Sequence, residues 1–166
     1  MNLFEQLQKI AEAPRGNVRK HLVRDFSQDE DFRWFWLNAL SPYIHFNLTA
    51  KVQSRQGTRL DLNPEFVELL DRIAAGEVTG ASAKSSVAAH LMEYPRVIQE
   101  YLVGMINKTP RMGVSVKTFR DVVPGLIPAF TMPLAYPVEW NRVKFPVQMS
   151  PKIDGLRCIF ENGELY

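Results

Sequence analysis

Hydrophobic side chains recur at helical spacing through about the first 130 residues of the chain. In the first run, Leu3, Leu7 and Ile10 would share one face of a helix, and the Pro-Arg-Gly turn at residues 14–16 would end it. Similar runs predict a helix capped by Asn17, one that opens at Asn63-Pro64 and stops at Gly76, and others over residues 82–93, from Pro95 onward and over residues 115–122. The pattern predicts a mainly α fold.

A dense aromatic run lies inside this helical part, between Asp29 and Phe46. Its members are Phe32, Trp34, Phe35, Trp36, Tyr43 and Phe46. Aromatic side chains at helical spacing usually form core, although they could also form a platform on which a ligand stacks. We favour the core interpretation.

From Leu126 onward, prolines interrupt the chain every few residues, so the helical pattern ends there. Residues 143–149 have the composition of a short strand. Residues 158–161 and 164–166 flank an Asn162-Gly163 pair, which is typical of a two-residue β-hairpin turn. We therefore expect a helical domain over residues 1–130, followed by the start of a β-rich domain over residues 131–166.

Composition narrows the class of protein. The chain has 166 residues, 46% of them hydrophobic, which suits one globular domain or a domain plus a fragment. No stretch is apolar enough to span a bilayer, and Met1 does not open a signal peptide, so we expect no membrane partner. The single cysteine, Cys158, excludes an internal disulfide and fits a cytoplasmic location. The scattered histidines, at 21, 45 and 90, lack ligand spacing, so we predict no metal site among them.

The charges are unevenly distributed, although the net charge is only +2. Residues 25–31 carry four acidic side chains and no basic one. Residues 95–120 carry five basic side chains, Arg96, Lys108, Arg111, Lys117 and Arg120, and one acidic side chain. Such a basic segment could follow a phosphate backbone, or it could simply be a solvated face.

The strongest chemical signal is the sequence Lys-x-Asp-Gly-x-Arg at residues 152–157. A lysine amine attacks phosphorus only when it is neutral, and nearby cations or a metal ion favour that form. Arg157 presents a planar fork that suits phosphate or ribose oxygens, and Gly155 allows a close approach of backbone. The alternative is a surface turn, because Asp-Gly pairs are common in turns.

Three blocks in this order resemble the ATP-dependent DNA ligases of the T-even bacteriophage type. They are Arg-Met-Gly-Val-Ser-Val-Lys-Thr at residues 111–118, Val-Pro-Gly-Leu-Ile-Pro at residues 123–128, and the Lys152 motif after Val-Lys-Phe-Pro at residues 143–146. In that family a helical DNA-binding domain precedes a nucleotidyltransferase (adenylation) domain. The resemblance therefore implies that residues 131–166 begin the adenylation domain, in host cytoplasm if the source is a phage.

The resemblance implies a three-step reaction with ATP and Mg²⁺. Lys152 would accept AMP, the AMP would pass to the 5′-phosphate at a nick, and the 3′-hydroxyl would seal the strand. Asp154, Gly155 and Arg157 would bind the nucleotide. The implied DNA-binding residues are Arg111, Gly113, Ser115, Lys117 and Thr118, and the implied partner is nicked double-stranded DNA bound by a monomer.

The chain departs from the family's pattern at two points. Ser150 stands where many ligases carry an adenine-binding glutamate, and the sequence reaches only Tyr166, before the later carboxylate motifs. We therefore expect this polypeptide alone to be inactive in nick sealing. One alternative is a duplex-binding helical module without chemistry. Another is a different lysine nucleotidyltransferase, such as an RNA ligase or capping enzyme, which the helical block disfavours.

Overall fold

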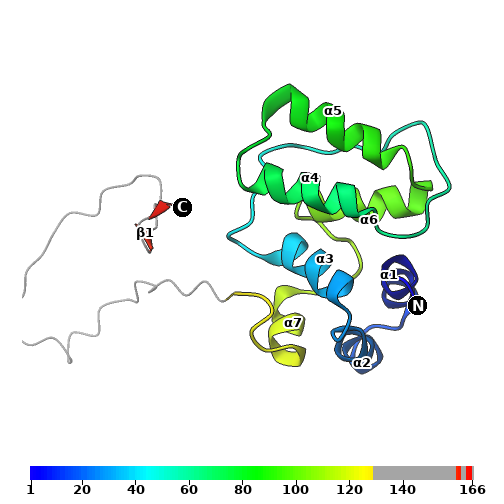
Figure 1. Ribbon diagram of the computed structural model, residues 1–166. Coiled ribbons are helices and arrows are strands. Elements are labelled where there is room, and N and C mark those ends of the chain that lie inside the picture. The colour runs from blue at the N-terminus through cyan, green and yellow to red at the C-terminus, as the bar shows by residue number, and fades with distance from the viewer. Residues whose placement is uncertain (129–159, 162–163, 166) are drawn as a thin grey trace, which may run out of the picture. The chain divides into compact units, whose positions relative to one another are not determined.

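The computed structural model describes residues 1–128, 160–161 and 164–165, drawn in colour in Figure 1. The first range forms seven helices: α1 (Leu3–Glu12), α2 (Asn17–Phe26), α3 (Glu30–Leu40), α4 (Pro64–Ala74), α5 (Gly80–Leu91), α6 (Arg96–Ile106) and α7 (Val116–Val122). By its contacts the chain divides into two units, Met1–Ala129 and Phe130–Tyr166.

The mainly α prediction is confirmed for the described residues, with small differences at helix ends. Helix α5 runs from Gly80 to Leu91, two residues earlier at each end than the predicted 82–93. Asn17 is the first residue of α2 and not its cap, because Gly16 takes the cap position with a φ of 99°. Glycine is the residue that adopts a positive φ without steric cost, which explains why a glycine and not an asparagine occupies the cap position.

The aromatic run forms the core, as predicted. Phe32, Phe35 and Trp36 of α3 are fully buried. The ring of Phe119, from α7, lies 4.7 Å from that of Trp36 and 6.3 Å from that of Phe32, measured between centroids. Such pairs contribute about 0.5–1.5 kcal/mol each beyond the area they bury. Helix α7 is therefore fixed on α3 by aromatic packing, and it also contacts α2.

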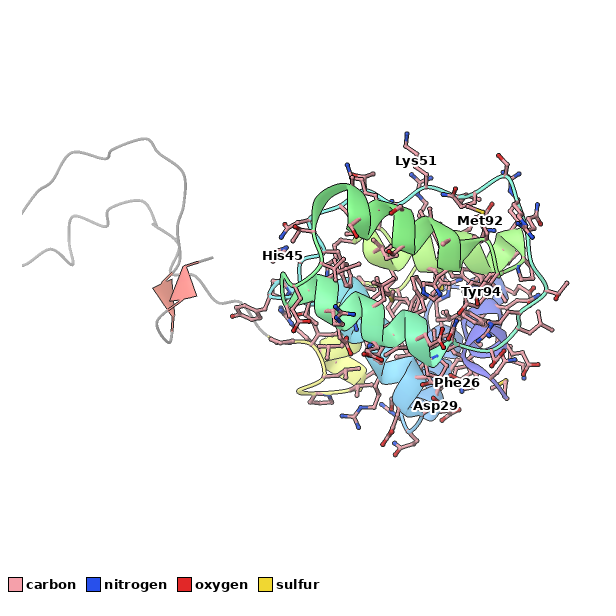
Figure 2. The ribbon with its side chains drawn as sticks, turned by 45° about the horizontal axis from the view of Figure 1, so that its top comes forward. Phe26, Asp29, His45, Lys51, Met92 and Tyr94 are labelled. Carbon is pink, nitrogen blue, oxygen red and sulfur yellow. The ribbon has the colours of Figure 1, made fainter. Side chains whose placement is uncertain are left out.

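A second cluster surrounds Tyr94, between α5 and α6. Its ring lies 5.7 Å from Phe4 of α1 and 6.3 Å from Phe66 of α4, and Figure 2 shows it inside the domain. The Tyr94 hydroxyl accepts a hydrogen bond of 2.9 Å from the backbone N–H of Asn63, the residue that caps α4. Burial raises the pKa of Tyr94 to about 12. Tyr94 therefore joins α1 to α4, with its ring against Phe4 and its neutral hydroxyl on the N-cap residue of α4.

The long connection between α3 and α4 is held by two side chains, Gln99 of α6 and Asn107 at its end. Asn107 donates to the carbonyl of Ala50 and accepts from its N–H, both at 2.9 Å. Gln99 accepts from the N–H of Gln53 at 2.8 Å and donates to the carbonyl of Arg55 at 3.0 Å. Because a buried backbone group without a partner is costly, these amide side chains replace the strand or helix that the connection lacks.

Lys108 follows α6 and joins it to α3. Lys108 has a φ of 58°. The backbone N–H of Lys108 donates to the Met105 carbonyl, and the N–H of Thr109 donates to the Gly104 carbonyl. Together these two bonds form a Schellman motif at the C-terminus of α6. The ammonium group of Lys108 donates to the carbonyls of Asn38 and Ser41, at the C-terminus of α3. Burial lowers the pKa of Lys108 to about 8, so most of the population is charged at pH 7.

The described residues of the second unit are two short strands, β1 (Phe160–Glu161) and β2 (Glu164–Leu165). They pair antiparallel, with Phe160 opposite Leu165 and Glu161 opposite Glu164. The expected type I′ turn and the strand over residues 143–149 lie outside the described residues. Among the described helices, none has the length and apolar character that a membrane crossing requires.

We expect the Lys108→Gly variant to be less stable than the wild type by about 1 kcal/mol at pH 7. Glycine relieves the positive φ, worth about 1 kcal/mol. The loss of hydrogen bonds from a charged donor to two carbonyls, at about 1.5–3 kcal/mol for such a bond, outweighs that relief. Urea unfolding followed by circular dichroism measures the difference, and a more stable variant would show that the α3 contact is worth less than the strain that glycine relieves.

Candidate nucleic-acid interface

The five predicted DNA-binding residues lie on residues 111–118, of which residues 111–115 form the segment that leads into α7 and residues 116–118 form the first turn of that helix. Side-chain exposure alternates along the segment: Met112 and Val114 are buried at 4% and 7% exposed. Arg111, Gly113, Ser115 and Lys117 are exposed between and after them, and Thr118 is half-buried. The burial of Met112 and Val114 leaves Arg111, Gly113 and Ser115 at the surface, whereas the exposure of Lys117 follows from its place in the first turn of α7.

Ser115 and Thr118 also stabilise the start of α7. The Ser115 hydroxyl accepts from the Thr118 N–H at 3.2 Å and lies 3.1 Å from the Thr118 hydroxyl. Serine is a favoured N-cap, so this pair has a structural role whether or not it contacts a ligand. The backbone carbonyl of Ser115 accepts a hydrogen bond from the N–H of Phe119, the residue whose ring anchors the helix.

Gly113 adopts a φ of 66°, and its position depends on an arginine from α2. The Arg19 guanidinium donates to the Gly113 carbonyl at 3.2 Å. It also donates to the carbonyls of Ala13, at 2.5 Å, and Ala11, at 3.4 Å, where α1 ends. A Cβ placed on Gly113 would lie 2.0 Å from an Arg19 Nη1 atom, so a side chain there would displace the guanidinium as well as strain the backbone.

Arg19 is buried, with 8% of its surface exposed, and it forms no ion pair within the described residues. Its three acceptors are carbonyl oxygens, which leave its positive charge unneutralised directly beneath residue 113. A partly desolvated charge is screened less than a surface charge. The segment that carries Arg111 and Lys117 therefore lies over a third, buried cation.

Arg19 was not among the residues predicted from the sequence. A signal for it does exist: it shares the inward face of α2 with Val23 and Phe26, at helical spacing. Arginine on an otherwise apolar face is unusual and marks a buried polar contact. The acceptor, however, is 94 residues away along the chain, and nothing in the local pattern identifies it.

The basic segment over residues 95–120 does not act as one surface. Arg96 pairs with Glu100 at 3.1 Å, Lys108 is committed to α3, and Arg120 donates to the Pro128 carbonyl at 2.8 Å. Within the described residues, neither Arg111 nor Lys117 has an ion-pair partner. Those two residues are the cations that the segment leaves available to an anionic ligand.

The acidic stretch has a structural explanation in part. Asp29 caps α3 by accepting from the N–H groups of Asp31 and Phe32, and it accepts from the Gln6 side chain at 2.9 Å. Glu30 and Asp31 lie in the first turn of α3, where negative charge is favourable. Burial, together with Asp29 and Glu30, raises the pKa of Asp31.

A hollow of about 400 Å³ adjoins Arg111 between α6 and the segment that leads into α7. Its wall includes Tyr101 and Gly104 of α6, Thr109, and Val52 of the long connection. Burial, with the nearby charges of Glu12 and Glu100, raises the pKa of Tyr101. Glu100 and Asn107 line it too, so Arg111 borders a concave surface of mixed polarity.

The predicted catalytic and nucleotide-binding residues, Lys152, Asp154, Gly155 and Arg157, lie outside the described residues. Their roles around the nucleotide therefore remain predictions from the sequence, which assigns no residue of this chain to Mg²⁺. Over residues 1–128, 160–161 and 164–165, no three His, Cys, Asp or Glu side chains gather into a metal-binding group.

Comparisons with known proteins give a fold relationship. No family model matches the chain, and no curated protein matches it. A solved structure named Pmar-Lig_PreS3 matches with a TM-score of 0.66 at 22% identity, over 81% of this chain and 33% of that one. Another, named Pmar-Lig_Pre, matches with a TM-score of 0.69 at 20% identity, over 82% of this chain and 33% of that one. The chain thus shares its fold with these proteins and spans about a third of their length.

Proposed function

We propose that residues 1–128 form the DNA-binding domain of an ATP-dependent DNA ligase, and that the chain carries the start of the adenylation domain with its nucleophile, Lys152. The domain would hold nicked duplex DNA through contacts to the sugar-phosphate backbone. The observation that carries this proposal is the joint exposure of Arg111, Gly113 and Ser115, which the buried Met112 and Val114 hold at the surface, and of Lys117 on the first turn of α7.

The chemistry of residues 111–118 suits a phosphate backbone. Arginine and lysine without acidic partners neutralise phosphates and release counterions. A glycine lets the ligand approach the main chain, and hydroxyl groups donate to phosphate oxygens. These contacts do not distinguish base sequences, as expected for an enzyme that must act at any nick.

The solved structures support the ligase interpretation at the level of fold. Their names contain "Lig", in agreement with the family that the sequence motifs resemble, and the matches cover 81% and 82% of this chain. Lys152 would accept AMP from ATP, with Asp154, Gly155 and Arg157 around the nucleotide. ATP with Mg²⁺ would supply the adenylyl group: the lysine nitrogen would bond to the α-phosphorus, and pyrophosphate would leave.

The second candidate function is duplex binding without chemistry. The described residues include the proposed binding segment and do not include the adenylation motif, and this is the only respect in which they favour binding without chemistry. The two functions share the interface at residues 111–118 and differ in the role of Lys152, so separate experiments test the interface and the lysine.

We expect Arg111→Ala and Lys117→Ala each to weaken binding to nicked duplex, equally for different base sequences. For each phosphate that the variant no longer neutralises, the slope of log K against log salt should fall by about 0.9. Fluorescence anisotropy over a range of salt concentrations measures both effects. The control is Arg72→Ala, which removes an exposed arginine from α4, and it should bind like the wild type. Unchanged slopes for both interface variants would disprove the assignment.

We expect Arg19→Lys to weaken duplex binding although Arg19 is buried. Arginine reaches Gly113 through Nη1 and the end of α1 through Nη2, whereas the single nitrogen of a lysine cannot span these positions, so Gly113 loses its support. The matched control is Val23→Ala, a buried change on the same helix that costs about 1–2 kcal/mol of stability without touching residues 111–118. Binding is measured on samples that circular dichroism shows to be folded. Equal affinities for the two variants would mean that Arg19 affects stability alone.

In the enzyme that contains this chain, we expect Lys152→Ala to abolish transfer of label from ATP labelled at the α-phosphate to the protein. The amine is the group that would bond to phosphorus, and alanine offers no replacement. Gel separation after incubation with Mg²⁺ detects the adduct. A label that survives in the variant would place the adenylate on another residue.

A further inference from the structure

A pattern of six residues occurs twice in the helical domain. Residues 80–85 are Gly-Ala-Ser-Ala-Lys-Ser, and residues 113–118 are Gly-Val-Ser-Val-Lys-Thr. The glycine, the serine and the lysine are the same in both copies. Alanine in the first copy corresponds to valine in the second at two positions, and each copy ends in a residue with a hydroxyl group. The second copy is the proposed DNA-binding segment, so the first copy identifies Lys84 as the counterpart of Lys117.

The two copies share the backbone conformation of their glycine, since Gly80 and Gly113 have φ values of 64° and 66°. They differ after it, because residues 80–85 lie within α5 whereas residues 113–115 precede α7. In the first copy Ala83 is buried at 1% exposed and Lys84 is exposed; in the second, half-buried Val116 precedes the exposed Lys117. Helix α5 contains no acidic residue, and within the described residues Lys84 forms no ion pair.

Lys84 shares a hollow with a second lysine from a different element. This hollow, of about 320 Å³, lies along the middle of α5, between Lys84 and Leu91, and its opposite wall is the long connection, which contributes Lys51. Thr49 and Gln53 also line it, and no carboxylate does so among the described residues. Figure 2 shows Lys51 projecting away from the body of the domain.

The backbone around Lys51 is fixed on both sides. Asn107 binds the N–H and the carbonyl of Ala50, and Gln99 binds the N–H of Gln53. A cation on an anchored backbone loses less conformational entropy when it binds than one on a free loop. Asn107 and Gln99 thus hold Lys51 beside Lys84, where two positive charges share one hollow without a counter-charge.

We propose that Lys51 and Lys84 form a second contact site for the sugar-phosphate backbone of the duplex that residues 111–118 bind. This inference rests on the proposed function. Helices α5 and α7 lie at opposite ends of the domain in Figure 1, so the two sites would hold the duplex at separate points. Two separate backbone contacts fix the direction of a duplex on a protein, which one contact cannot do.

The test is the salt dependence of binding to a nicked duplex of about two helical turns by the full chain, with folding checked by circular dichroism. The Lys51→Ala/Lys84→Ala double variant should lower the slope by about 1.8, because each lysine that no longer neutralises a phosphate removes about 0.9. The matched control, Lys9→Ala/Arg72→Ala, removes two cations from α1 and α4 and should keep the wild-type slope.

The Arg111→Ala/Lys117→Ala variant, measured in parallel, separates the two proposals. If it weakens binding while the Lys51 and Lys84 variant keeps the wild-type slope, the second site is wrong and the proposed function stands. An equal reduction of slope in the Lys9 and Arg72 control would also overturn the second site, because the effect would then be general charge. If the wild-type chain binds no duplex at all, both proposals fail.

Discussion

The packing of Phe119 against Trp36 and Phe32 is the interaction on which the proposed interface depends. It fixes the short helix α7 to the centre of the domain, at 4.7 Å and 6.3 Å between ring centroids. Helix α7 has only seven residues, too few to be stable by itself in water. Its position, and with it the outward direction of Lys117 and Ser115, therefore comes from this tertiary contact.

Buried and half-buried polar side chains then fix the segments that the aromatic core does not reach. Arg19 holds Gly113, Gln99 and Asn107 hold the long connection, and Lys108 holds the end of α3. Each of these side chains bonds backbone groups of a distant segment that would otherwise be buried without a partner. Surface loops usually carry the binding residues of a protein while a rigid scaffold positions them. In this domain the positioning is done by a few long polar side chains.

Local patterns in the sequence predict the helices well and the connections poorly. Periodicity, Asn63-Pro64 and Gly76 identify α4, because these signals act within one turn of helix. The contacts of Arg19 and Gln99 join residues 94 and 46 positions apart, and no local signal specifies them. A count of basic residues in the sequence likewise overestimates the number of cations available to DNA. Arg96 and Lys108 are basic, but they bind groups within the protein. The residues around Lys152 remain predictions that rest on their motif.

The most direct test of the central claim is a map of backbone amide chemical shifts of the chain during titration with a nicked duplex. The account predicts that large shifts occur at residues 111–118, where buried Met112 and Val114 turn their neighbours outward, while the exposed face of α4 keeps its free-state shifts. Shifts that centre on α4 and leave residues 111–118 unchanged would contradict it.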